Sequence, residues 1–339
     1  MLALRRGVVL AAGDPGGPMQ ELDVRLGADR RPAVADVALV GPSRMGDEVI
    51  VNVAAVDLEL APGGFDVVHV NLTRGLEGAG TPGAHVMKLH YTSMQHAVVP
   101  VESSAPAGAP LVLPTEAPVA ICFVHGQLPP LAWAFAQAAP GARLGYVQTT
   151  GGALPGALSE TVRMLRRRGL LAAHITAGQA YGGEGDAVTT AGALQHGFAE
   201  RYWHAAVCGP GPGVLGSGTA LGHGGLVALE SAHTAAALGC QVVICPRRSS
   251  ADPRPRHRGV SHHTRMLLEL ALVPFIVAHH GDRPAAGRGR HEWRQGEADL
   301  DAYAASGLPA RAMGRSIEED PEFFAAALAA GSVLAQCAA

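Results

Sequence analysis

The chain has 339 residues, of which 48% are hydrophobic, enough for packed cores and comfortable for two domains. Its 26 Lys and Arg residues nearly balance 29 Asp and Glu residues, which argues against a broad nucleic-acid-binding face and limits anion binding to local clusters. The longest apolar stretch, residues 266–278, is broken by Glu269 and Pro274 and is shorter than the roughly 20 residues of a membrane span. We therefore expect a soluble protein with no membrane partner.

Cysteine usage points to a reducing compartment. The five cysteines form no C-x-x-C pair, and three of them lie in apolar, strand-like runs where a free thiol behaves as a small hydrophobic group. The apolar run at residues 8–12 is too short for the core of a signal peptide. These features predict a cytoplasmic protein and leave open whether it forms a homo-oligomer.

The first part of the chain has the periodicity of strands. Up to residue 113, short runs with a period near two are separated by Gly, Pro and Asp, at 7–11, 21–26, 35–40, 47–53 and 65–71. Short strands at this spacing are typical of a small antiparallel barrel or sandwich. Residues 1–113 are therefore predicted to form a small all-β, barrel-like domain, with the turn-rich segment at 103–110 as the linker.

Residues 114–339 alternate strand-like runs with longer helical patterns. This alternation predicts a Rossmann-like α/β domain, in which helices cover both faces of a parallel sheet. The Arg- and Gly-rich residues 280–298 are expected to form a loop, and Ser316-Ile-Glu-Glu319 reads as a capping box that opens a C-terminal helix. The predicted strands are 119–124, 144–148, 172–176, 204–208 and 241–245, and the predicted helices between them are 131–138, 154–168, 187–201 and 220–238.

Polar and glycine-rich segments follow each predicted strand. Ligands bind at the carboxyl ends of the strands in an open parallel sheet, so these segments are expected to converge. His125 follows the first strand and is a candidate acid or base, although such a histidine also serves to bond its own loop. The candidate ligand contacts after the next two strands are Thr149, Thr150, Gly151 and Gln179.

The loop after the fourth strand has three interpretations. Gly211, Gly213 and Gly216 match G-x-G-x-x-G, and Arg247-Arg248 follow the next strand, an arrangement found in NADP-binding enzymes. However, Pro210 and Pro212 remove backbone donors, and the fingerprint normally follows the first strand of its domain. A simpler phosphate or carboxylate cradle would use a helix N-terminus, and the third interpretation is a tight turn. The cradle residues would be Gly216, Ser217, Gly218 and Thr219.

The densest chemical signal is the run from Asp252 to Arg265. An anion site there would use Arg256, Arg258 and Ser261, together with the neighbouring His263. A metal site would use three imidazoles and one carboxylate, and a solvated loop is the remaining reading. The imidazoles cannot share a face of one regular helix, so only a transition from loop to helix, with Ser261 as the cap, would bring two of them together. The candidate metal ligands are His257, His262, His263 and Asp252.

Two resemblances bear on this run and on the whole chain. The piece from His257 to His262 locally resembles the H-R-G-x-T-H-S element of some membrane-associated metal-dependent hydrolases. Nearly the whole chain resembles a family of uncharacterised bacterial proteins, the domain of unknown function numbered 3866. That resemblance implies the two-domain organisation and the choice of site, without a reaction. It rests on segments within 46–52, 85–95, 146–155, 178–183, 209–219, 252–263 and 313–321.

The function expected from these residues is that of a cytoplasmic enzyme for a small phosphorylated or carboxylated ligand. In this hypothesis Arg256 and Arg258 anchor the anion while His257 or His262 moves a proton. A hydrolase or transferase is favoured over an oxidoreductase. The alternatives are a metal-dependent hydrolase, an NADP-binding oxidoreductase, and a non-enzymatic sensor whose first domain binds nucleic acid or another partner. Neither NADP nor a divalent metal is favoured as the cofactor, and a nucleic-acid partner is not expected.

Overall fold

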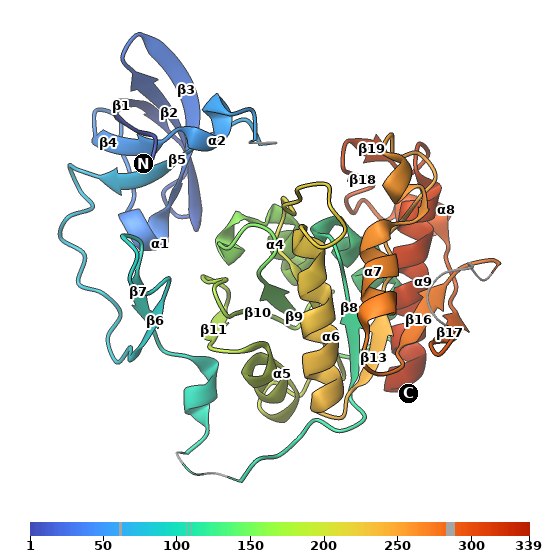
Figure 1. The fold of residues 1–339 in the computed structure, drawn as a ribbon. Coiled ribbons are helices and arrows are strands. Elements are labelled where there is room, and N and C mark those ends of the chain that lie inside the picture. The colour runs from blue at the N-terminus through green and yellow to red at the C-terminus, as the bar shows by residue number, and fades with distance from the viewer. Residues whose placement is uncertain (61–62, 107, 109, 283–288) are drawn as a thin grey trace. The chain divides into compact units, whose positions relative to one another are not determined.

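The computed structural model describes residues 1–60, 63–106, 108, 110–282 and 289–339 (Figure 1). The chain divides into two compact units, Met1–Val99 and Pro100–Ala339. The division lies earlier than the expected boundary at 113/114 because residues after 100 are bonded to the second unit. The Glu102 carboxylate accepts hydrogen bonds from the backbone N–H groups of Val188 and Thr189, at 2.9 and 3.2 Å.

The first unit contains a closed barrel, as the short alternating runs predict. Strand β1 pairs antiparallel with β2 and β4, β4 pairs antiparallel with β5, and β5 closes the ring by running parallel to β3. Five-stranded Greek-key barrels of this kind include the OB-fold. The elements are β1 (Leu4–Ala12), β2 (Met19–Leu26), β3 (Asp29–Asp36), α1 (Val37–Val40), β4 (Glu48–Asn52), α2 (Ala54–Asp57) and β5 (Asp66–Asn71), followed by the hairpin β6 (Val86–Lys88) and β7 (His96–Val98).

The barrel is poor in aromatic residues along its strands. None of its five strands contains Phe, Tyr or Trp, the side chains on which bases stack. Several of its arginines are paired with acids, including Arg6 with Glu48 at 2.7 Å and Arg31 with Asp57 at 2.8 Å.

The second unit is a parallel α/β domain, which confirms the predicted fold class. Its eight strands follow the order β11-β10-β9-β12-β8-β13-β16-β17, and all pairs are parallel. The five predicted strands appear within a few residues of their expected bounds. The strands are β8 (Pro118–Ile121), β9 (Leu144–Thr149), β10 (Ala173–Ala177), β11 (Gly185–Ala187), β12 (Ala205–Pro210), β13 (Gln241–Ile244), β16 (Ile276–His279) and β17 (Glu292–Gln295).

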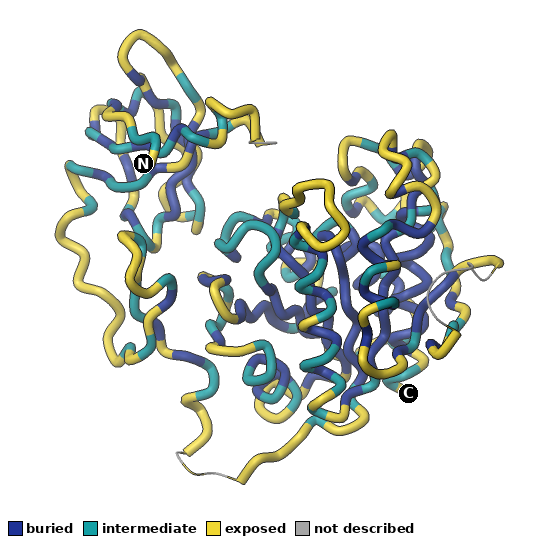
Figure 2. Tube along the Cα trace, viewed as in Figure 1, coloured by how far each residue is buried: buried dark blue, intermediate teal, exposed yellow. Residues whose placement is uncertain are grey.

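Helices cover the sheet in two groups. Helix α6 packs against α5 and α7, and also against β8, β12 and β13, while α3 packs against α4 and α9 (Figure 1). The strands between them are buried on both faces, as Figure 2 shows for the centre of the domain. The helices are α3 (Leu128–Ala138), α4 (Glu160–Arg167), α5 (Thr190–Ala199), α6 (Val227–Ala237), α7 (His262–Leu270), α8 (Leu300–Ala305) and α9 (Pro321–Ala338).

Two expectations for the C-terminal part need correction. The segment 280–298, expected to be a loop, contains strand β17 (Glu292–Gln295), which pairs parallel with the edge of β16. Residues 283–288 of this segment lie outside the described residues. The capping-box bonds between Ser316 and Glu319 form at 2.6 and 3.3 Å, but helix α9 begins later, at Pro321.

Helix α9 is long and apolar enough to cross a membrane by length and composition, and it is the one such helix among the described residues. However, 72% of it is buried inside the domain, where it packs on α3 and on the strands β8, β13 and β16. Its hydrophobicity is therefore that of a core helix.

Candidate functional site

The structure brings the glycine-rich loop and the histidine-arginine run side by side. The rings of His223, from the loop, and His263, from the run, stack with their centroids 3.9 Å apart and their planes 5° apart. The two segments also approach at a second place, since a Cβ atom on Gly218 would lie 3.9 Å from the Arg256 guanidinium. The two segments therefore lie in contact, although they are about forty positions apart in the sequence.

The local structure of the run follows from its sequence. After β13, a small hairpin of β14 (Arg248–Ser249) and β15 (Gly259–Val260) turns the chain toward α7. Ser261 then caps α7, with its Oγ atom accepting a hydrogen bond from the His263 N–H at 3.3 Å. This is the loop-to-helix transition that the sequence requires for convergence of the imidazoles, since it places His262 and His263 in the first helical turn.

Four imidazoles gather at this transition. The ring centroid of His262 lies 5.0 Å from that of His223, 4.8 Å from that of His257 and 4.5 Å from that of His263. Three of the residues, His223, His262 and His263, each offer a potential metal-ligating atom, and these atoms all lie within 4.8 Å of one another. The sequence reading missed His223, whose only signal was its position between Gly222 and Gly224-Gly225 in the glycine-rich loop.

The hydrogen bonds of the cluster leave one buried lone pair free. His223 Nε2 donates to the Ala220 carbonyl at 3.0 Å, so its Nδ1 atom carries a lone pair in the neutral ring. That Nδ1 atom is buried and has no hydrogen-bond partner among the described residues. His263 Nδ1 accepts from the Arg247 guanidinium at 3.3 Å, and His257 Nδ1 lies 2.7 Å from Ser261 Oγ.

Burial and positive neighbours keep the four rings neutral. Burial, followed by the charge of Arg247, lowers the pKa of His257 to about 3 and that of His263 to about 2. Burial and the nearby His223 ring lower the pKa of His262 to about 4, and burial also lowers the pKa of His223. Neutral imidazole is the form that binds metals, whereas a ring with so low a pKa is a poor proton carrier near pH 7.

Asp252 has a different role from the one expected of a metal ligand. Its side chain is fully buried and accepts from Arg254 at 2.8 Å and from Arg315 at 3.4 Å, with Arg247 at 3.6 Å. Burial alone would raise the pKa of this carboxyl, but hydrogen bonds and charge from Arg254 hold it well below its usual range. The ion cluster ties this loop to Arg247 and Arg315 of neighbouring segments.

The arginines in and just before the run divide into those held by structural contacts and those that are available. Arg247 is buried beside Asp252, Arg248 pairs with Glu322 at 2.7 Å, and Arg258 donates to the Asp252 carbonyl at 3.0 Å. Arg256 is exposed and, among the described residues, has no ion-pair partner. It is therefore the arginine best placed to receive an anionic group.

The cradle expected at Ser217, Gly218 and Thr219 does not have a helix behind it. Helix α6 begins at Val227, not near residue 220, and residues 215–222 form an exposed loop (Figure 2). Ser217 Oγ donates to the Gly222 carbonyl at 2.9 Å, and Thr219 Oγ1 accepts from the Gly222 N–H at 3.0 Å. The hydroxyls close the loop, while Gly216 pairs with His223 in an isolated antiparallel bridge.

The residues expected to bind NADP do not form a dinucleotide site in the structure. The G-x-G-x-x-G glycines do not open a helix, because the whole loop separates Gly216 from α6. Arg247 and Arg248 are committed to Asp252 and Glu322, so neither is free for a ribose phosphate. These positions are explained by the hairpin and the ion cluster.

His125 stands apart from the imidazole cluster. Its Nδ1–H donates to the Pro210 carbonyl at 3.2 Å, and its Nε2 accepts from Ser159 Oγ at 2.7 Å. Burial lowers its pKa to about 4. Because Ser159 also caps α4, this histidine joins the ends of β8 and β12 to a helix, as a histidine that bonds its own surroundings would.

Thr149, Thr150 and Gln179 line a cavity of about 370 Å³ at the carboxyl ends of β9 and β10. Gly151 lies beside it and is needed for a close contact, because a Cβ atom there would be 2.5 Å from the Gly224 carbonyl oxygen. Gly225, the next residue, faces the imidazoles: its Cβ atom would lie 2.7 Å from His263 Nδ1 and 3.1 Å from His223 Nδ1. The cavity and the imidazole cluster thus flank the same short segment.

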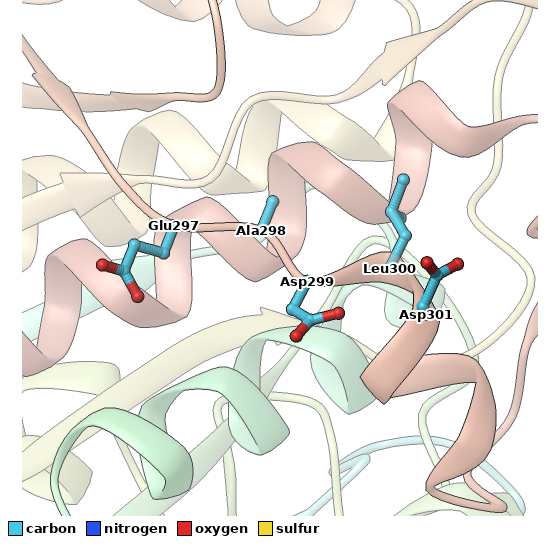
Figure 3. A pocket seen from close by; sticks show the side chains of 5 residues that line it. All are labelled: Glu297, Ala298, Asp299, Leu300 and Asp301. Atoms are coloured by element: carbon cyan, nitrogen blue, oxygen red, sulfur yellow. The ribbon is translucent and has the colours of Figure 1, made fainter.

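A second hollow, shown in Figure 3, lies around residues 297–301. Its carboxylates, from Glu297, Asp299 and Asp301, point in different directions and do not converge on one point. Asp299 accepts the Ala302 N–H at 2.9 Å as the cap of α8. These acids are accounted for by helix capping and solvent exposure.

Comparison with known proteins identifies a family without a reaction. A family model described as "Protein of unknown function (DUF3866)" matches residues 32–331, which include about two thirds of the first unit and nearly all of the second. No curated protein and no solved structure gives a significant match to the chain. The resemblance predicted from the sequence segments is confirmed at the level of the family.

Proposed function

The chain belongs to the family of unknown function DUF3866. We propose that the protein is a metal-assisted hydrolase that acts on a small anionic substrate. His223, His262 and His263 would hold a divalent transition metal of the zinc class. Arg256 would hold the phosphate or carboxylate group of the substrate. The proposal keeps the anionic ligand expected from the sequence and assigns the imidazoles to the metal.

The observation that carries this proposal is the convergence of three imidazole ligands around a buried free lone pair. Their potential ligand atoms lie within 4.8 Å of one another, and His223 Nδ1 has no other partner among the described residues. A buried polar atom without a partner costs about 1–3 kcal/mol, so a bound ion would explain why it is kept. Three protein ligands with an open fourth position are characteristic of catalytic zinc sites.

The surroundings fit such a role. A bound divalent metal supplies Lewis acidity, which activates water for hydrolysis at neutral pH. The neutral rings need no proton loss before they bind it. An ion bound at His263 Nδ1 would compete with the Arg247 donor, which lies 3.3 Å away. Arg256 beside Gly218 can hold the substrate anion near the rings and neutralise charge that develops during hydrolysis.

Proton transfer by His257 or His262 without a metal is the weaker alternative. Both have pKa values near 3 to 4, far from the neutral range in which general acids and bases work best. His257 is also engaged with Ser261, which makes it a residue that orients the α7 cap. A cytoplasmic location remains part of the proposal, supported by five free cysteines, four of them buried.

Elemental analysis tests the proposal directly. Protein purified without chelator is expected to contain about one equivalent of zinc, manganese or iron per chain, consistent with one three-ligand site. It is also expected to hydrolyse p-nitrophenyl phosphate, and to lose this activity after dialysis against a chelator and regain it with zinc. Protein that contains no metal and takes up none from a zinc solution would contradict the proposal. If the protein contained metal but did not hydrolyse ester probes, the metal site would stand and the hydrolase function would be rejected.

A further inference from the structure

The cavity at the ends of β9 and β10 has a distinct chemistry. It lies between the first turns of α5 and α6, at the carboxyl edge of the sheet where ligands of parallel α/β domains bind. At about 370 Å³ it is large enough for a small molecule. Half of its lining residues carry hydroxyl groups: Thr149, Thr150, Thr189, Thr190, Ser231 and Thr234.

Some of these polar groups are free to bind a ligand. Thr149 and Ser231 use their hydroxyls on the carbonyls of Thr150 and Val227, at 3.3 and 3.0 Å. Within the described part of the chain, the side chains of Thr150, Thr190 and Gln179 have no such partner. A hydroxyl both donates and accepts, so this lining matches a ligand that carries hydroxyl groups itself.

Glu230 gives the cavity its charge. It lies in the first turn of α6, lines the cavity and, among the described residues, makes no ion pair. Among the described residues, no Lys, Arg, His or aromatic side chain lines the cavity. A phosphate or carboxylate would meet a carboxylate without a compensating cation, and a nucleobase would find no ring on which to stack.

We infer that this cavity binds an aminated polyol, such as an amino sugar. The ammonium group would pair with Glu230, and the hydroxyl groups would bond with Thr150, Thr190 and Gln179. The inference goes beyond the proposed hydrolase, because it rests on the cavity alone and needs no metal.

Calorimetric titration of the full-length protein tests the inference with glucosamine, glucose and glucuronate as probes. Glucosamine is expected to bind about tenfold more tightly than glucose, since a hydrogen bond to a charged group is stronger than a neutral one. Glucuronate is expected not to bind. Equal affinity for all three sugars, tighter binding of glucuronate, or no binding of glucosamine would overturn the inference.

Two variants separate the parts of the site. Glu230→Gln is expected to reduce glucosamine affinity about tenfold, to the level of glucose, and to leave glucose unchanged. Thr150→Val is expected to weaken both sugars by the same factor. Glu200→Gln, at an exposed position at the end of α5, makes the same charge change and is expected to alter neither. Retention of glucosamine selectivity in Glu230→Gln would reject the assignment of the ammonium site.

The titrations are repeated with chelator present. Binding of glucosamine that persists without metal supports the cavity independently of the proposed hydrolase. Binding that vanishes when the metal is removed would show that the sugar binds at the metal centre, and would overturn the inference while leaving the metal site intact.

Discussion

Replacing Gly225 with alanine is expected to weaken zinc binding about 10- to 100-fold without removing any ligand, the range seen when the groups that orient metal ligands are lost. A Cβ atom at this position would lie 2.7 Å from His263 Nδ1 and 3.1 Å from His223 Nδ1. Both contacts are with side chains, so the rings are displaced while the backbone is retained. Competition of the purified variant with a zinc-chelating dye measures the affinity.

Three further variants serve as controls and as a reference for this measurement. Gly216→Ala is the matched control, because its Cβ atom would have no neighbour closer than 3.6 Å, and it is expected to bind zinc like the parent. His223→Ala removes a ligand and defines complete loss, whereas His69→Ala removes a histidine of the barrel strand β5 and is expected to have no effect. If Gly225→Ala bound zinc as tightly as Gly216→Ala, the stacked rings would not be the metal ligands.

Replacing Asp252 with asparagine is expected to destabilise the second unit by about 3–5 kcal/mol, the usual cost of removing one partner from a buried ion pair. The change removes the negative charge shared by Arg247, Arg254 and Arg315 and leaves Arg247 buried without an anion. Urea denaturation, followed by circular dichroism, measures the loss. Asp301→Asn, at an exposed position of α8, is the control and is expected to change stability by less than about 0.5 kcal/mol.

The same carboxylate predicts a pH dependence. Because the folded protein holds the pKa of Asp252 below that of the unfolded chain, its contribution to stability is present above about pH 4 and is lost as the pH falls below that value. The buried neutral histidines lower the stability of both proteins as the pH falls below about 6.5. The stability difference between parent and Asp252→Asn should therefore shrink below pH 4; a difference constant down to pH 2 would contradict this role.

Prediction from the sequence succeeded where a single strand or helix start has a simple local pattern of residues. The apolar runs of β8, β9, β10, β12 and β13 were recognisable because strands buried on both faces need continuous apolar residues. The Ser261 cap was recognisable because a serine before a helical run offers its oxygen to the first turn. The edge strand β17 was missed because its sequence, Glu-Trp-Arg-Gln, is mostly polar.

The site was predicted only in part, because its residues act through contacts that are distant in sequence. His223 had no histidine neighbours along the chain, and its place in the cluster depends on stacking against a residue forty positions later. Asp252 has the chemistry of a metal ligand, but three arginines from different segments decide that it serves as their counter-ion. Likewise Ser217 and Thr219 suit a phosphate, yet the late start of α6 turns their hydroxyls toward Gly222.

The strand order has a consequence for how the polypeptide acquires its native state. Strand β8 is the first of the large sheet to leave the ribosome, yet both of its neighbours, β12 and β13, are made much later. We expect β9 and β10 to associate early, while β8 waits for partners distant in sequence, a topology associated with slow folding and transient exposure of apolar strands. Newly made chains that stop before β13 should accordingly aggregate or recruit chaperones.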